Sequence, residues 1–201
     1  MDIYLIRHTT PAIAKGICYG QTDLDVTDSF PEEMLRTKAH LPQTVSTVFS
    51  SPLQRCRKLA EALFPQHPIH FHDHLKELDC GTWEMQPWDD IPKEEIDPWM
   101  KDFVHVAVPN GESYTRMHKR VVDCFEQIQQ HPGPAVIVAH GGVLRSILSH
   151  ITNTPLKESF DAFTLHYGCV VRLYQNGSGF AHEVLYNHSL EGKEWHRPSK
   201  N

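Results

Sequence analysis

Short apolar or β-branched runs, bounded by turn residues, recur along the chain and predict buried strands. These runs cover residues 2–7, 45–50, 135–139 and 169–174. Between them, apolar side chains return at helical spacing over residues 52–64, 112–130 and 143–151. Strands that alternate with helices predict an α/β fold, here a three-layer sandwich with a mostly parallel central sheet and helices on both faces.

The helix predicted over residues 52–64 has a clear start signal, because Ser51 suits the N-cap and Pro52 the first helical position. Its first turns carry Arg55. A cation there lies against the positive end of the helix dipole, which is unfavourable unless an anion compensates it. The sequence therefore predicts a negatively charged group near Arg55.

Residues 79–110 differ from the alternating pattern. They contain Trp83, Trp88 and Trp99 with prolines between them, so we expect a partly helical insertion or lid over the strand ends. No shift in composition marks a second domain, and residues 1–201 are predicted to form a single domain. The polar residues 192–201 are predicted to form a flexible tail.

Composition narrows the class of protein. Apolar residues make up 40% of the chain and charged residues 22%, which is ordinary for a globular protein. A net charge of −6 argues against nucleic acid or an anionic membrane as a partner, since either needs a dense field of lysine and arginine. The five cysteines form no C-x-x-C pair, and no apolar run reaches membrane-spanning length. We expect a cytoplasmic protein that is a monomer or a homodimer.

Charged residues follow the predicted strands at the edge where open α/β sheets bind ligands. They are Arg7 and His8 at the end of the first strand, Arg55 after the second, and His140 after the strand over residues 135–139. Gly141 and Gly142 then open a helix whose free N–H groups suit an anion. Together these features predict a local phosphate site.

Each of these residues also has an ordinary structural interpretation. The chain has 15 histidines, most of which we expect at the surface or in packing, and strand ends tolerate polar residues such as His8. Arg55 alone would be typical of the exposed face of an amphipathic helix, and the charged stretch 76–79 would be typical of a solvated edge. Only a shared pocket would make these residues a site.

Five short motifs occur in order along nearly the whole chain. They are Arg7-His8 after a short strand, Ser50-Ser51-Pro52-Leu53-x-Arg55 before a helix, Glu77-Leu78-Asp79-x-Gly81-x-Trp83-Glu84, Gly111-Glu112-Ser113, and His140-Gly141-Gly142 after an apolar strand. Each motif alone is weak, whereas all of them in this order resemble the histidine phosphatase (phosphoglycerate mutase-like) superfamily.

The resemblance implies hydrolysis of a phosphomonoester through a phosphohistidine, with His8 as the nucleophile. To attack, His8 must be neutral, and neighbouring cations disfavour its protonated form. The residues implied to hold the phosphoryl oxygens are Arg7, Arg55 and His140. The other residues implied to bind substrate are Gly141, Thr9, Tyr19 and Gln21. Glu77 would protonate the leaving alkoxide and then activate water. The resemblance implies no cofactor and no metal, and a small phosphorylated metabolite as the partner.

Departures from the family pattern narrow the activity. Thr9 and Thr10 stand where many members have Gly-Glu, and the Trp-Asn pair of the mutases is missing from residues 9–17, which favours a phosphatase over a mutase. Residues 16–23, and residues 88–92 together with Trp99, resemble the α-ribazole phosphatase branch. That resemblance implies α-ribazole 5′-phosphate, from cobalamin nucleotide-loop assembly, as the substrate.

Two other functions fit parts of the sequence. Histidines cluster over residues 67–74, and such clusters can bind zinc, which would favour a metallohydrolase. In a strand, however, His70 and His72 would share one face while Ile69 and Phe71 share the other. The fold with its phosphate site would also suit a non-catalytic binding module, because a fold does not decide function.

Overall fold

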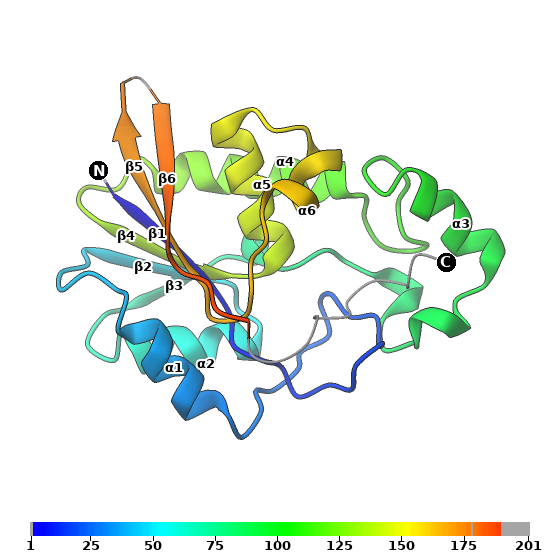
Figure 1. The fold of residues 1–201 in the computed structure, drawn as a ribbon, viewed down its shortest axis with the longest axis horizontal. Coiled ribbons are helices and arrows are strands. Elements are labelled where there is room, and N and C mark those ends of the chain that lie inside the picture. Colours follow the sequence, from blue (N-terminus) through cyan, green and yellow to red (C-terminus); the bar gives the residue numbers. More distant parts are fainter. Residues whose placement is uncertain (1, 178, 190–201) are drawn as a thin grey trace.

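A six-stranded β-sheet in the order β3-β2-β4-β1-β5-β6 forms the centre of the molecule (Figure 1). The structure is a computed structural model that describes residues 2–177 and 179–189. The strands are β1 (Ile3–Arg7), β2 (Thr47–Ser50), β3 (Ile69–Phe71), β4 (Ala135–Ala139), β5 (Val170–Asn176) and β6 (Gly179–Tyr186). The strands from β1 to β4 pair in parallel, and β5 and β6 extend the sheet in antiparallel orientation. The sheet is therefore mostly parallel, as predicted.

Helices cover both faces of the sheet (Figure 1). They are α1 (Phe30–Lys38) and α2 (Gln54–Leu63) on one face, and α4 (Tyr114–Ile128), α5 (Gly141–Thr152) and the short α6 (Ser159–Ala162) on the other. Alternation along β1 explains the two cores, because Ile3 and Leu5 pack with α4 and α5, whereas Tyr4 and Ile6 pack with α2. The predicted three-layer α/β sandwich is confirmed.

The strands predicted from apolar runs are all present, with ends shifted by no more than about two residues. The sequence pattern missed α1, the short α6, β3 and β6. The β6 strand is exposed or half-buried along its whole length, and β3 has only 3 residues, so neither shows a buried apolar run. The buried residues of α1 are Glu33 and Thr37, which give it no apolar stripe.

The start of α2 differs from the prediction. The helix begins at Gln54, with Leu53 in the N-cap position and no capping bond from that side chain. The carboxylate of Asp23 satisfies the first free amide instead, accepting a hydrogen bond of 2.6 Å from the Gln54 N–H. Ser51 as the N-cap and Pro52 as the first helical residue are therefore wrong, because a side chain from a distant loop caps this helix.

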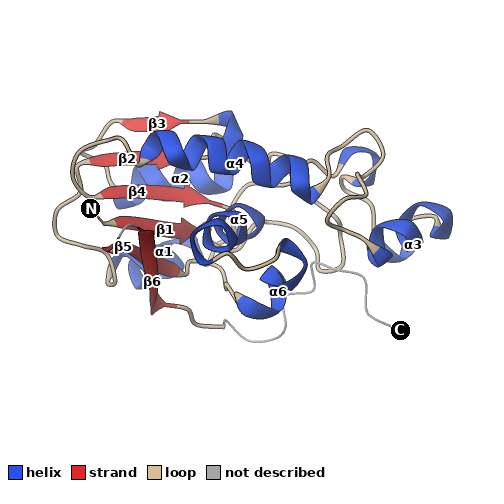
Figure 2. Cartoon of the chain, turned by 90° about the horizontal axis from the view of Figure 1, so that it is seen from above, coloured by secondary structure: helices blue, strands red, loops and turns tan. Residues whose placement is uncertain are grey.

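Residues 79–110 form a partly helical insertion beyond the carboxyl ends of the parallel strands (Figure 2). It contains α3 (Lys93–Lys101) and short 3₁₀ turns. The rings of Trp83, Trp88 and Trp99 pack against one another, with centroids 5.6 to 6.3 Å apart, and form a small core of their own. Closure of the insertion as a lid remains a prediction.

Two further predictions concern the tail and membranes. The tail predicted over residues 192–201 lies outside the described residues. Among the helices of residues 2–177 and 179–189, none combines the length and the apolar character that crossing a bilayer requires.

Candidate active site

The parallel register brings the predicted strand ends together. The β4 strand lies between β1 and β2, with its Ala139 opposite Arg7 of β1. The residues that follow are therefore neighbours: the His8 amide donates to the Ala139 carbonyl at 3.0 Å, and the rings of His8 and His140 meet edge to face with centroids 5.1 Å apart. We call Arg7, His8, Arg55 and His140 the strand-end cluster.

His8 is buried at the centre of the strand-end cluster, with 2% of its surface exposed. Its Nδ1 lies 2.7 Å from the Thr9 carbonyl oxygen. A carbonyl only accepts hydrogen bonds, so Nδ1 must carry the proton. In the neutral ring this tautomer leaves the lone pair on Nε2, which is the form that a nucleophile requires.

Arg7 is 6% exposed and lies against aromatic side chains. Its Nη1 donates to the Leu165 carbonyl, and its guanidinium covers the Tyr167 ring, 4.1 Å from the centroid. The Tyr167 hydroxyl is 2.9 Å from that of Tyr19, and burial raises the pKa of Tyr19. A side chain on Gly141 would lie 3.4 Å from Arg7 Nε. Gly141 therefore lies beside Arg7, whereas the Tyr19 ring lies beside Arg55, whose guanidinium is 5.5 Å from the ring centroid.

Arg55 is fully buried in the first turn of α2 and forms no ion pair with any described residue. Its Nη1 and Nη2 donate to the carbonyls of Thr22 at 2.9 Å and Gly20 at 2.6 Å, while its Nε has no hydrogen-bond partner in the described part of the chain. The buried Thr9 hydroxyl also lacks a partner there. Unsatisfied buried donors and an unpaired cation are costly unless an anion binds them, which agrees with the predicted phosphate site.

His140 is fully buried, and its Nε2 lies 2.8 Å from Ser51 Oγ. Burial, followed by the nearby charge of Arg55, lowers the pKa of His140 well below its usual value of 6.5. Burial also raises the pKa of the neighbouring Cys56 thiol to about 12, so Cys56 stays protonated. At neutral pH, His140 is therefore an uncharged hydrogen-bonding group.

The lowered pKa of His140 predicts a pH-dependent stability. The unfolded chain binds a proton at His140 below about pH 6.5, whereas the folded chain resists it, so the free energy of unfolding falls as the pH drops from 6.5 toward the folded pKa. The free energy of unfolding is measured with urea at pH 7.0 and pH 5.5, and the difference gives its slope against pH. His140→Asn should reduce this slope by up to about 1.4 kcal/mol per pH unit. The exposed His188→Asn is the control, and an unchanged slope in His140→Asn would contradict the prediction.

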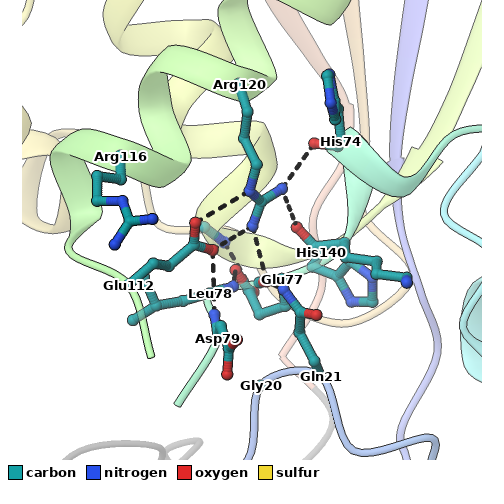
Figure 3. A network of polar contacts seen from close by, with 12 residues as sticks. Gly20, Gln21, His74, Glu77, Leu78, Asp79, Glu112, Arg116, Arg120 and His140 are labelled. Atoms are coloured by element: carbon teal, nitrogen blue, oxygen red, sulfur yellow. Dashed lines mark hydrogen bonds and ion pairs between the residues drawn. The ribbon is translucent and has the colours of Figure 1, made fainter. Parts of the chain in front are cut away.

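Glu77 reaches the strand-end cluster from an irregular segment. Its Oε2 accepts from the Gly142 amide at 3.0 Å, and its Oε1 accepts from the Leu78 amide at 3.0 Å. Gly142 belongs to the first turn of α5, so the Glu77 carboxyl group lies at the N-terminus of that helix. The Gln21 side chain donates to the Glu77 carbonyl at 3.1 Å (Figure 3). Gln21, predicted to bind substrate, therefore contacts the backbone that carries Glu77.

The close approach of Glu77 to Gly142 makes a specific prediction. A Cβ atom on Gly142 would lie 2.3 Å from Glu77 Oε1, so Gly142→Ala must displace the carboxylate. Alanine is the better helix former by about 1 kcal/mol, and a flexible side chain moves easily. We expect the Tm to hold while kcat/KM for an alkyl phosphate falls about 10²-fold. Full activity in Gly142→Ala would show that the observed place of Glu77 is not needed.

Glu84 is a further polar residue beside the site. Its carboxylate accepts from the amides of Gly20 at 3.0 Å, Gln21 at 2.7 Å and Thr22 at 3.2 Å. The same loop supplies the carbonyls that bind Arg55, so Glu84 anchors the loop that holds Arg55. The sequence assigned Glu84 no role beyond its place at the end of the third motif, because 64 residues separate Glu84 from Gly20 and no local pattern links them.

The histidines over residues 67–74 lie at the β3 edge of the sheet. The rings of His70 and His72 both face Phe49, with centroids 5.5 and 5.8 Å away, as strand alternation predicts. Within the described residues, no group of three or more His, Cys, Asp or Glu side chains is arranged to hold a metal ion. The zinc alternative therefore has no ligand set in this part of the chain.

The fold and the strand-end cluster together define a class of α/β proteins that have a cationic ligand site beyond the carboxyl ends of parallel strands. The family model of the histidine phosphatase superfamily (branch 1) matches residues 3–188 of this chain. The chain belongs to the histidine phosphatase superfamily, which confirms the resemblance found in its motifs and the prediction of a metal-independent phosphatase.

Individual relatives agree with this assignment. A metal-independent phosphoserine phosphatase of Arabidopsis thaliana is 30% identical over 164 residues, which cover 75% of this chain and 68% of the relative. The crystal structure of the α-ribazole phosphatase from Shigella flexneri superposes with a TM-score of 0.86 at 24% identity, covering 96% of this chain and 100% of the other. The structure of a mycobacterial glucosyl-3-phosphoglycerate phosphatase superposes with a TM-score of 0.76 at 19% identity, covering 94% of this chain and 99% of the other. The two structures are similar in fold.

Proposed function

We propose that the chain hydrolyses a phosphomonoester through a phosphohistidine at His8 Nε2. The observation that carries the proposal is the hydrogen bond from His8 Nδ1 to the Thr9 carbonyl, which in the neutral ring places the lone pair on Nε2, the atom that would attack phosphorus. Arg7 and Arg55 compensate the charge of the phosphoryl group, and neutral His140 offers an N–H without adding charge before the substrate binds. Most of the catalysis in phosphoryl transfer comes from such positioning and charge stabilisation.

The reaction divides into two displacements. First, the Nε2 lone pair of His8 forms the P–N bond while the ester P–O bond breaks, and the leaving oxygen takes a proton from Glu77. Water then attacks the phosphorus, Glu77 accepts a proton from the water, and the P–N electron pair returns to His8 as inorganic phosphate leaves. Neither step needs a metal or a cofactor.

As substrate we propose α-ribazole 5′-phosphate, from cobalamin nucleotide-loop assembly. The support is the likeness of residues 16–23 and 88–92 to the α-ribazole phosphatase branch. The rings of Tyr167, beside Arg7, and of Tyr19, beside Arg55, also offer surfaces on which an aromatic base could stack. Trp83 and Trp88 are 1% and 8% exposed and so are occupied in packing.

O-Phosphoserine is a second candidate substrate, because a metal-independent phosphoserine phosphatase is 30% identical to this chain. For the protein as a whole, we propose a cytoplasmic monomer or homodimer that acts on a small phosphorylated metabolite.

A substrate panel tests the proposed function. The purified chain is assayed in excess EDTA with p-nitrophenyl phosphate, α-ribazole 5′-phosphate and O-phospho-L-serine. We expect turnover to be unaffected by EDTA and kcat/KM to be highest for α-ribazole 5′-phosphate. Highest kcat/KM for phosphoserine would assign the second substrate, loss of activity in EDTA would favour the metallohydrolase, and no hydrolysis of any ester would favour the binding module.

A further inference from the structure

Arg120 holds the segment that carries Glu77, although it lies outside the strand-end cluster (Figure 3). Glu77 lies between the 3₁₀ turns Asp73–Leu75 and Gly81–Trp83, where it belongs to no helix or strand. A proton donor must be held within hydrogen-bond reach of the leaving oxygen. Another part of the chain must therefore restrain Glu77.

The guanidinium of Arg120, on α4, makes as many hydrogen bonds as it has N–H groups. Its Nη1 donates to the carbonyls of His74 at 2.7 Å and Lys76 at 2.8 Å, and its Nη2 donates to that of Glu77 at 2.9 Å. The remaining N–H groups, on Nε and Nη2, bind the carboxylate of Glu112. These bonds hold the backbone up to and including Glu77.

Glu112 holds the other side of Glu77. Its Oε1 accepts from the Asp79 amide at 3.1 Å, and its own amide donates to the Asp79 carbonyl at 3.1 Å. The side chains of Arg120 and Glu112 are 17% and 12% exposed, so water screens their attraction only partly. We call this pair the Arg120-Glu112 clamp, since it restrains the chain on both sides of Glu77.

We propose that Arg120 is a positioning residue for proton transfer: with Glu112, it holds the Glu77 carboxylate where the leaving oxygen departs. The inference rests on the proposed function, in which Glu77 is the proton donor. All five N–H groups of Arg120 bind Glu112 or the carbonyls of His74, Lys76 and Glu77, so loss of the Arg120-Glu112 clamp should spare phosphoryl binding. A lysine keeps the charge but has no planar fork to bridge these carbonyls.

The test is whether the loss of kcat/KM in Arg120→Lys depends on the leaving group of the substrate. We measure kcat/KM, which reports formation of the phosphohistidine, with ethyl phosphate, whose leaving group needs a proton, and with p-nitrophenyl phosphate, whose leaving group does not. We expect about a 10²-fold loss with ethyl phosphate and a loss of less than about threefold with p-nitrophenyl phosphate. Arg116→Lys, at an exposed position one turn earlier on α4, is the matched control and should change neither value.

A double variant separates positioning from general destabilisation. If Arg120 acts only through Glu77, Arg120→Lys should add no further loss with ethyl phosphate in a Glu77→Gln background. Equal losses on both substrates, or a full additional loss in the double variant, would overturn the inference. If Arg120→Lys fails to fold, Glu112→Gln, which keeps the shape of the clamp, is measured in its place. It is expected to lose kcat/KM with ethyl phosphate and not with p-nitrophenyl phosphate. If Glu77→Gln itself shows no leaving-group dependence, the proposed role of Glu77 fails instead.

Discussion

His8→Ala is expected to abolish turnover, with kcat lowered by at least about 10⁴-fold, since removal of a nucleophile eliminates the covalent route. The structure gives this expectation its physical basis. The imidazole is buried, its Nδ1 proton is bound by the Thr9 carbonyl, and in the neutral ring the lone pair lies on Nε2. Incubation with a ³²P-labelled substrate and rapid quenching should give an acid-labile, alkali-stable phosphate label on the native chain and none on the variant.

The matched control for this experiment is His105→Ala, which removes an exposed histidine. It should keep both the turnover and the label. Binding of inorganic phosphate to His8→Ala tests whether the other residues of the site are intact. Arg7 and Arg55 remain in this variant and should still hold the anion. Near-normal turnover in His8→Ala would refute the nucleophile assignment, and a label that persists would place the phosphoryl group on another residue.

Glu77→Gln should produce the second largest effect, and one that depends on the leaving group. With ethyl phosphate, kcat/KM should fall by about 10²- to 10⁴-fold, because the amide cannot give the proton that an alkoxide needs. With p-nitrophenyl phosphate, kcat/KM should change little, since the aryl oxide leaves unprotonated. Glutamine is close to glutamate in shape, and its amide oxygen can still accept from the Gly142 amide that now binds Oε2.

Glu61→Gln, at an exposed position on α2, is the matched control and should leave both substrates unaffected. The variant also reports the second displacement. If Glu77 activates water, Glu77→Gln should accumulate phosphohistidine with p-nitrophenyl phosphate, seen as a burst of p-nitrophenolate before a slow steady state. Equal losses in kcat/KM with both esters would instead make Glu77 a structural residue.

The strand-end cluster could be predicted from the sequence because the signals that indicate it lie close together along the chain. Apolar runs predict strands, the turn residues beyond them predict strand ends, and the carboxyl ends of parallel strands meet at one edge of a sheet. Arg7, His8 and His140 therefore come together through the β1-β4 register alone. The motif resemblance added Glu77, which no apolar pattern would have singled out, because it lies on an irregular segment.

The interactions that hold these residues in place could not be predicted in the same way. The cap of α2 comes from Asp23, 31 residues before Gln54. The α2 start was therefore misplaced, even though the local signal at Ser51 was good, because a hydrogen bond forms wherever the fold brings donor and acceptor together. Ser51 Oγ instead lies 2.8 Å from His140 Nε2, 89 residues away in the chain.

The sequence by itself determined the layers of the fold, the strand ends and which candidate residues meet there, because periodicity and residue chemistry act over short stretches. The tertiary structure alone decided the tautomer of His8, the neutral state of His140 and the Arg120-Glu112 clamp on Glu77. Hydrogen-bond geometry and burial, which control these features, arise only when distant segments pack together.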